Sequence, residues 1–361
     1  MKYAKKMMFG LVLIVLIAML ASCSGSSGDS AGETADNESG GKPYEGQELV
    51  VVGWGGALQD AQREAIFKPF EEEYGVTITE VSPTDYSTVT AMCQNGNIEY
   101  DVVNVQPDYA IRMKDYLEPI DYNIVDNTDF DEAWYNDYYV ASDLYITAIV
   151  YNTDSMQDKH PTTWAEVWDT TTFLGKRTFW NYPTGTLEAA LLADGVEPDQ
   201  LYPLDVDRAF KSLDKIKPEV AKWWDTGAES IQLITNNEAS VGCLWGSRVD
   251  EAKSQGQAAD LEFNESIVGA DAWVVPKGTK KKELAMEFIS FATRAEQMAE
   301  FMKLYPNGSV NLKAYDLLDK KTLDGLATNP EKVKNQILMN DEWWVENGDE
   351  VVSRFTEWLL E

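Results

Sequence analysis

Apolar and polar positions along the chain follow two different periods in turn, which indicates strands alternating with helices. Residues 49–52 form a short apolar run typical of a buried strand. From Gln59 onward, apolar residues recur at steps of three and four, as they do on one face of a helix. Two more β-prone runs follow at 76–81 and 99–105, with a polar helix expected around 88–94 between them. This order predicts a parallel α/β sheet.

The alternation continues through the second half of the chain. A β-rich run over 145–151 and a strand-like run over 240–245 enclose a segment with helices of its own. These helices are expected within residues 162–169, 185–195 and 205–224. After the run GADAWVVPKG at 269–278, the pattern predicts one long amphipathic helix over 280–305 and a final helix over 347–361.

Candidate ligand contacts lie where the first strands end. In parallel α/β sheets, ligands sit beyond the carboxyl ends of the strands. Trp54 follows the first expected strand, and Asp85 and Tyr86 follow the second. Residues 106–109, which include Asp108, follow the third. We therefore expect a binding crevice at this edge of the sheet.

The N-terminus predicts export. Three lysines among the first six residues precede an apolar run of secretory-signal length, which is short for a membrane span of about 20 residues. The run ends in Leu20-Ala21-Ser22-Cys23, which resembles a bacterial lipobox. Residues 1–22 are therefore expected to be a lipoprotein signal peptide and Cys23 to carry the lipid. Residues 23–46 are rich in Gly, Ser and acids, which is typical of a flexible tether.

Composition and charge narrow the functional classes. The 361 residues include 30 Lys and Arg against 61 Asp and Glu, a formal net charge of -31. Nucleic-acid binding is disfavoured, because phosphate recognition needs clustered Lys and Arg. The acidic excess suits the solubility of an exported protein and is compatible with a cationic partner. Cys93 and Cys243 lie far apart in sequence and are expected to be buried free thiols, although an exported protein could pair them.

Six stretches, in order, resemble one family. They are GWGGALQDAQREAIFKPFEEEYG, YDVV, AIVYNTD, TLEAALLADGVEPDQLYPLDVDRAFKSLDKIKP, GADAWVVPKGTKKKELAMEFISFAT and YPNGSVNLKAY. From about Glu48 onward the chain is similar to the solute-binding proteins of ABC importers, in the type II periplasmic-binding-protein branch that binds spermidine and putrescine. The resemblance implies a monomeric receptor on the outer face of the cytoplasmic membrane. It would not be an enzyme, would need no cofactor or metal, and would deliver a small amine to a membrane permease.

The resemblance also implies two α/β lobes joined by two crossover segments, with the ligand cleft between the lobes. By position, residues 144–152 would form the first crossing and 271–278 the second. Lobe 1 is then expected to comprise residues 47–147 and 274–361, and lobe 2 residues 148–273. Closure about the two crossings would bury the ligand.

Asp271 is the strongest candidate to bind the ligand's ammonium group. It lies in an otherwise apolar, β-prone run, where burying a carboxylate without a partner is costly. By position it matches the family's ammonium-binding aspartate. The alternative is a hinge aspartate bonded to backbone N–H groups.

Aromatic residues are the expected walls of the cleft, because flat apolar faces suit methylene chains and attract cations. By the resemblance, Trp54, Trp245 and Tyr305 match cleft residues of the family, and Trp273 beside Asp271 is grouped with them. Each could instead be a core or turn residue. The weaker candidates, which are more often surface or core, are Asp85, Tyr86, Asp108, Trp180, Tyr182 and Glu188.

Two features depart from the polyamine pattern. Residues 180–186 lack the acidic pair that spermidine binders of the family carry early in lobe 2. Arg248 follows Trp245 by three residues, and a guanidinium suits bidentate binding of a carboxylate. If Arg248 faces the cleft, the ligand is an ω-amino acid such as 4-aminobutyrate. If it does not, it is a surface or structural arginine, and a polyamine remains the first expectation.

Three other classes stay open with less support. Tyr138 and Tyr139 resemble the adjacent tyrosines of ferric-ion binders of this fold, but His160 is the single histidine of the chain. A sugar or polyol could use the same aromatic walls. The remote enzymatic alternative is a secreted hydrolase that acts through two carboxylates.

Overall fold

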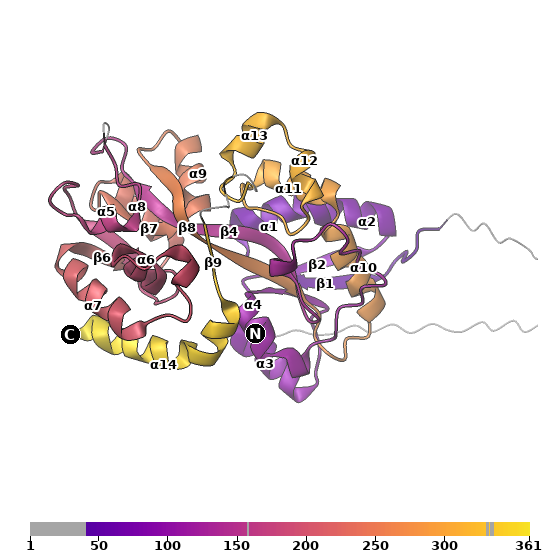
Figure 1. Ribbon diagram of the computed structural model, residues 1–361. Coiled ribbons are helices and arrows are strands. Elements are labelled where there is room, and N and C mark those ends of the chain that lie inside the picture. The colour runs from indigo at the N-terminus through magenta and orange to yellow at the C-terminus, as the bar shows by residue number, and fades with distance from the viewer. Residues whose placement is uncertain (1–40, 157–158, 330–331, 333–335) are drawn as a thin grey trace, which may run out of the picture. The chain divides into compact units, whose positions relative to one another are not determined.

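Nine strands form one mixed sheet in the part of the chain that the structure describes. The computed structural model describes residues 41–156, 159–329, 332 and 336–361. The sheet has the strand order β2-β1-β3-β8-β4-β7-β5-β6, and β9 pairs with β8 (Figure 1). The strand bounds are β1 (Glu48–Val52), β2 (Thr77–Val81), β3 (Val102–Val105), β4 (Val140–Tyr151), β5 (Arg177–Trp180), β6 (Val220–Trp224), β7 (Val241–Trp245), β8 (Asp260–Val274) and β9 (Ile337–Leu338).

Two long strands, β4 and β8, run through both halves of this sheet. They pair antiparallel from Val140 opposite Trp273 to Tyr151 opposite Asp260. The parallel strands β1, β2 and β3 flank them on one side and β5, β6 and β7 on the other. The expected crossings lie on β4 and β8, and the predicted two-lobed α/β fold is confirmed.

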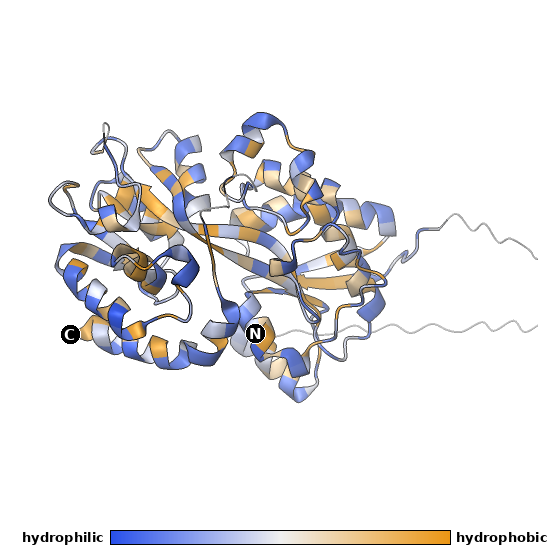
Figure 2. Cartoon of the chain, viewed as in Figure 1, coloured by the Kyte–Doolittle hydropathy of each residue, from blue (hydrophilic) through white to orange (hydrophobic). Residues whose placement is uncertain are grey.

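Helices cover the sheet on both halves, and apolar residues concentrate in the central strands (Figure 2). The first half carries α1 (Gly56–Gln62), α2 (Lys68–Tyr74), α3 (Tyr86–Asn95), α4 (Pro107–Arg112), α10 (Lys282–Ala292), α11 (Ala295–Leu304), α12 (Lys313–Asp316) and α13 (Lys320–Gly325). The second half carries α5 (Trp164–Trp168), α6 (Thr186–Ala193), α7 (Val206–Ile216), α8 (Gly227–Thr235) and α9 (Gly246–Ser254). In the described residues, no helix is long and apolar enough to cross a membrane.

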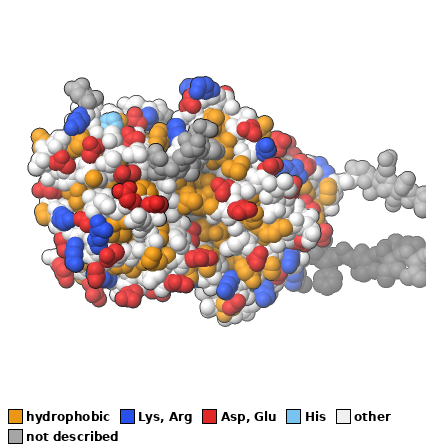
Figure 3. All heavy atoms as spheres, in the orientation of Figure 1, with side chains coloured by type: hydrophobic (Ala, Val, Ile, Leu, Met, Phe, Trp, Pro, Cys, Tyr) orange, Lys and Arg blue, Asp and Glu red, His pale blue; other side chains and the backbone are white. Residues whose placement is uncertain are grey.

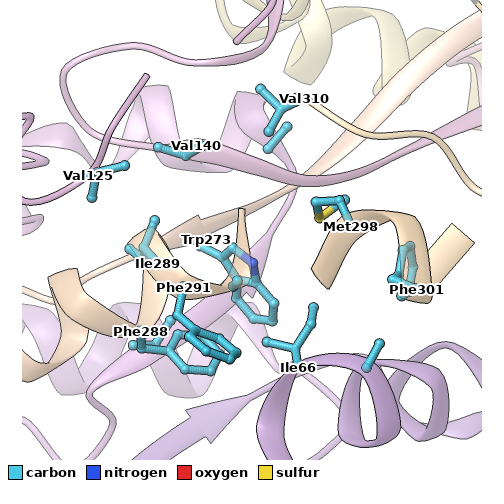
Figure 4. Packing of buried hydrophobic residues seen from close by; sticks show 14 of the residues in the cluster. Ile66, Val125, Val140, Trp273, Phe288, Ile289, Phe291, Met298, Phe301 and Val310 are labelled. Carbon is cyan, nitrogen blue, oxygen red and sulfur yellow. The ribbon is translucent and has the colours of Figure 1, made fainter. Parts of the chain in front are cut away.

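Each half has its own apolar core. In the first, Trp273 of β8 is fully buried beside Phe288 (Figure 4), with their ring centroids 5.5 Å apart. The ring centroid of Phe67 lies 6.4 Å from that of Trp273. In the second, Leu187 and Leu191 of α6 pack with Phe210 of α7. Two separate cores joined by two strands are the construction that a hinged pair of lobes requires.

The C-terminal helix α14 (Asp341–Leu360) belongs to the second core. Its buried residues Val351, Phe355 and Trp358 pack around Phe210 and Trp223 of lobe 2. The expected assignment of residues 274–361 to lobe 1 is therefore wrong for this helix, because its apolar face is covered by lobe 2. The other lobe boundaries stay a prediction.

Local differences from the expected elements have simple causes. The helix expected over 205–224 ends at Ile216, and β6 follows, because Pro218 lacks the N–H that a continuing helix needs. The helix expected over 280–305 is broken into α10 and α11, where the Thr293 hydroxyl donates to the carbonyl of Ile289 and Arg294 is extended. The other expected strands and helices form, but three begin earlier than predicted: β4 at Val140, β8 at Asp260 and α14 at Asp341.

The end of the expected tether is part of the fold. The Tyr44 ring stacks on Tyr74 at 6.1 Å, and the Gly46 N–H donates to the carbonyl of Gly75.

The expected signal peptide 1–22 and Cys23 lie outside the described residues. Cys93 and Cys243 are buried and free, as expected. On the face in Figure 3, acidic and basic side chains are interspersed, and apolar side chains gather near its middle.

Candidate ligand-binding site

A cavity of about 440 Å³ lies between the two halves of the sheet and α14. Residues from the first half, the second half and α14 all contribute to its lining. Its aromatic lining residues are Trp54, Tyr86, Tyr145, Trp180, Tyr182, Trp245, Tyr305 and Trp344. Its charged lining residues are Asp108, Arg112, Arg248, Asp271 and Asp341. An apolar, aromatic cavity with a few convergent charges is typical of a small-molecule site.

The loop after β1 presents Trp54 to the cavity. Gly55 has a φ of +78°, a conformation that favours glycine, and its N–H donates to Gln59 Oε1 of α1 at 2.9 Å. The turn therefore starts the helix immediately and leaves Trp54 beside Tyr86, with ring centroids 5.9 Å apart. These two rings form the wall of the first lobe.

The second lobe supplies the opposite wall. Trp245, at the end of β7, meets Trp180 of β5 edge-on with centroids 5.3 Å apart, and Tyr182 lies 4.9 Å from Trp180. Gly227 allows α8 to approach this wall. A Cβ at Gly227 would lie 2.7 Å from Arg248 Nε and 3.1 Å from the Trp245 ring. Any larger residue at position 227 would displace both side chains.

Asp271 forms the acidic floor of the cavity. It lies on β8 directly opposite Asp143 of β4 and is 8% exposed. Burial, followed by the neighbouring Asp143 carboxylate, raises the pKa of Asp271 well above its usual range. The Trp54 indole acts in the opposite direction and lowers the pKa of Asp271. Within the described residues, no Lys or Arg forms an ion pair with Asp271, which leaves it available to a cationic ligand.

Asp143 is fully buried behind this floor. Its oxygens accept hydrogen bonds from the Ser142 hydroxyl at 3.0 Å and from Asn307 Nδ2 at 2.5 Å. Both donors are neutral, and burial raises the pKa of Asp143 to about 6. Asn307 itself lines the cavity, so it links Asp143 to the ligand space.

Two arginines line the cavity, and they differ in how they are paired. Arg112 contacts Asp108 on α4 and also lies 3.3 Å from Asp349 of α14. Arg248 has one carboxylate nearby, Glu251, at 3.6 Å. Burial raises the pKa of Tyr305, and the nearby Ser247 and then the Arg248 charge lower it. Arg248 is thus the cavity cation with the weaker partner.

The start of α14 adds a carboxylate and an indole to the cavity. Asp341 is half-buried and makes no hydrogen bond or ion pair within the described part of the chain. Burial, followed by the nearby Asp108, raises the pKa of Asp341 to about 7. Trp344 is held in place because its Nε1–H donates to Glu188 Oε1 at 2.8 Å.

Most of the residues predicted from the sequence meet in this cavity. Those that line it are Trp54, Tyr86, Asp108, Trp180, Tyr182, Trp245, Arg248, Asp271 and Tyr305. Asp85 and Trp273 do not. Asp85 caps α3 by accepting the Thr88 N–H, and Trp273 packs in the first core. Trp273 follows Asp271 by two residues on β8, and the pairing of β8 with β4 is irregular between Ala141 and Asp143. Glu188 is fully buried, where it accepts from the Gly185 N–H and Tyr202.

Sequence reasoning missed several polar and aromatic residues that line or support the cavity, among them Arg112, Asp143, Tyr145, Asn307, Asp341 and Trp344. Asp143 could have been found by the same signal as Asp271, because it too is a carboxylate inside an apolar strand. Tyr145 follows it by two residues, on the same face of β4. Asp341 and Trp344 follow β9, whose long-range pairing with β8 is not revealed by any local pattern.

The features behind the ferric alternative lie away from the cavity. Tyr139 packs in an apolar cluster with Val103 and Ala272, and Tyr138 packs against the same cluster. His160 stacks on Tyr151 with centroids 4.0 Å apart, outside the cavity lining. In the described residues, no group of three or more His, Cys, Asp or Glu is arranged to hold a metal ion.

Known proteins with similar sequences are transport receptors. A profile of bacterial extracellular solute-binding proteins matches residues 65–334. A gamma-aminobutyric acid-binding protein of Pseudomonas aeruginosa is 31% identical over 86% of this chain and 91% of its own length. A spermidine/putrescine-binding periplasmic protein of Haemophilus influenzae is 24% identical over 80% of this chain and 82% of its own length.

Solved structures share the fold. An ABC transporter substrate-binding protein from Bradyrhizobium japonicum superimposes with a TM-score of 0.84 at 31% identity, covering 87% of this chain and 99% of that one. The structure of a GABA receptor superimposes with a TM-score of 0.80 at 39% identity, covering 86% of this chain and 97% of that one.

Proposed function

The chain belongs to the bacterial extracellular solute-binding proteins of ABC importers, and from this premise we propose that its ligand is a linear ω-amino acid such as 4-aminobutyrate. The observation that carries the proposal is the placement of Asp271 and Arg248 on the lining of one aromatic cavity. Asp271 would bind the ammonium group and Arg248 the carboxylate. A zwitterion satisfies both, whereas a diamine leaves Arg248 facing a like charge.

The relatives support the same choice. The GABA-binding protein and the GABA receptor share 31% and 39% of their aligned residues with this chain, whereas the polyamine-binding relative shares 24%. The first expectation from the sequence, a polyamine, is therefore replaced as the leading ligand class by its alternative. The Arg248 that raised the alternative is a lining residue of the cavity.

The way in which the protein captures its ligand follows from the lobes on which the charged and aromatic residues lie. Trp54 lies in the first lobe, Trp245 and Arg248 lie in the second, and Asp271 lies on a strand common to both. A ligand favours the closed form only through its higher affinity for that form. The ligand gains the contacts of both walls when the lobes approach, so closure buries it and gives the permease a distinct shape to bind.

A diamine remains the second candidate because of Asp341. This carboxylate lines the cavity and has no ion-pair partner in the described residues, so with Asp271 it would provide two anionic anchors. Asp341 would then take the role of the acidic pair that spermidine binders of the family carry and that residues 180–186 lack. Its pKa of about 7 means, however, that below neutral pH a second ammonium would first have to displace a proton from Asp341, which weakens this anchor.

Lipid anchoring at Cys23, export and a monomeric state complete the proposal. They rest on the lipobox-like Leu20-Ala21-Ser22-Cys23 and on the family's role outside the cytoplasm. An anchor with several acyl chains would hold the receptor near its permease, since each buried methylene contributes about 0.8 kcal/mol.

A thermal-shift panel tests the ligand class. We expect 4-aminobutyrate to raise the melting temperature, because a ligand at 100 times its Kd stabilises a protein by about 2.7 kcal/mol. Putrescine and spermidine should shift it less, and maltose not at all. A shift with the diamine and triamine alone would overturn the proposal in favour of the second candidate, and a shift with maltose alone would contradict both.

A further inference from the structure

Two buried carboxylates stand side by side beneath the ligand space. Asp143 of β4 and Asp271 of β8 are directly opposite each other in the antiparallel pairing, so their side chains project from the same face of the sheet. Asp143 is 0% exposed and Asp271 is 8% exposed. Opposite residues in such a pair have Cβ atoms about 5 Å apart. The two carboxyl groups therefore lie close enough for the charge of one to affect the ionisation of the other.

The donors around this pair are neutral. Ser142 and Asn307 donate to Asp143, and Asn104 Nδ2 in turn donates to the Ser142 hydroxyl at 2.8 Å. Among the described residues, no lysine or arginine forms an ion pair with either acid. Neutral donors can hold one carboxylate in a buried site, but two adjacent buried carboxylates without a cation cannot both ionise.

We propose that Asp143 and Asp271 share one proton in the empty cleft, and that capture of the ligand's ammonium group expels this proton to solvent. The empty pair then carries one negative charge. When the ammonium binds at Asp271, the pair gives up its proton and carries two, so the cation brought by the ligand offsets the charge that is gained. Asp143 is thus a positioning residue that acts on the ligand through Asp271. The inference rests on the proposed function only in that the ligand carries an ammonium group.

The direction of the pH effect follows from this exchange. The pKa of Asp143 is about 6 and that of Asp271 is raised by burial and by Asp143. Below these values the empty pair holds its proton, so binding must expel it and weakens as the pH falls. Well above them the proton is already lost, and affinity no longer depends on pH.

Other groups face the pair and have to be separated from it. The titratable and charged groups that line the same cavity as Asp271 are Tyr86 of α3, Asp108 and Arg112 of α4, Tyr145 of β4, Tyr182 after β5, Arg248 of α9, Tyr305 after α11 and Asp341 of α14. Burial raises the pKa of each of the four tyrosines, which keeps them neutral, and Asp108 contacts Arg112. Asp341, with a pKa of about 7, is the group that could imitate the effect.

Calorimetry in two buffers of different ionisation enthalpy counts the protons. At about pH 6, close to the pKa of Asp143, we expect 4-aminobutyrate to release a substantial fraction of one proton per ligand bound. The Asp143→Asn variant should release clearly less, and the pH dependence of its Kd should move to lower pH, because Asp271 loses the charge of Asp143 while its burial remains. The Asp341→Asn variant should keep the release of the natural protein. An unchanged release in Asp143→Asn, or none in the natural protein, would overturn the inference.

A ligand-free measurement keeps the inference independent of the ligand's identity. Carboxyl ¹³C shifts of the empty protein should show Asp143 and Asp271 titrating together, and Asp143→Asn should lower the pKa of Asp271. Independent titration of the two acids would refute the shared proton even if 4-aminobutyrate binds. If 4-aminobutyrate does not bind but putrescine does, the proposed ligand class fails, while proton release on putrescine binding still decides this inference.

Discussion

Replacing Asp271 by asparagine is expected to lower the affinity for 4-aminobutyrate by about a hundredfold to a few thousandfold, measured by calorimetry at neutral pH. Asparagine keeps the shape of the side chain but removes the charge that faces the ammonium. Breaking a buried ion pair by removing one partner costs about 3–5 kcal/mol, and each 1.4 kcal/mol is about tenfold in Kd. Asp143 cannot take over, because it is fully buried and both its oxygens already accept hydrogen bonds.

The matched control is Asp85→Asn. Asp85 also follows a strand and was predicted as a site residue, but the structure uses it as the N-cap of α3. Asparagine caps helices about as well as aspartate, so this variant should fold and bind with an unchanged Kd. An Asp271→Asn protein that binds as tightly as the Asp85→Asn control would remove Asp271 from the site.

Substitution of Arg248 by alanine is expected to separate the two ligand classes. The Kd of 4-aminobutyrate should rise about thirtyfold or more, because truncating one partner of a charge pair costs about 2–5 kcal/mol. We take the lower end of that range, because 37% of the Arg248 side chain is exposed in this structure. Putrescine should bind Arg248→Ala as well as or better than the natural protein, since a repelling cation has been removed.

Two companion variants sharpen this comparison. Lys253→Ala removes a cation from the same helix, α9, whose partner Asp260 lies outside the cavity, and should leave both ligands unaffected. Asp341→Asn should weaken putrescine more than 4-aminobutyrate. If Arg248→Ala weakens putrescine and 4-aminobutyrate equally, Arg248 supports the wall around Trp245 and is not a carboxylate anchor.

The sequence pattern predicted the alternating strands and helices because that pattern is local, whereas the two lobes were implied by the family resemblance. The apolar runs at β1, β2 and β3 and the helices between them are each specified within about ten residues. The position of α14 is not local: its buried Phe355 and Trp358 fit any apolar groove, and only the completed second core selects Phe210 and Trp223 as their neighbours. The helix breaks at Pro218 and Thr293 each depend on a single residue inside an otherwise periodic segment, so the periodicity alone did not predict them.

The site was predictable where a residue type conflicted with its surroundings. Asp271 stood out as a carboxylate in an apolar strand, and the structure makes it part of the cavity floor. Asp85 stood out as well, but an acid just before a helix is also an N-cap, and the cap is what the structure shows. Asp341 precedes the helix expected over 347–361, so the sequence did not single it out, and only the structure places it in the first turn of α14. Asp341 lines the cavity because α14 follows β9, which pairs with β8 far away in the sequence.

The most direct test of the central claim is a crystal structure of the protein with 4-aminobutyrate. The account predicts the ligand between Trp54 and Trp245, its nitrogen in contact with the Asp271 carboxylate and its carboxylate in contact with the Arg248 guanidinium. A ligand bound in the reverse orientation, or one that touches neither Asp271 nor Arg248, would contradict it.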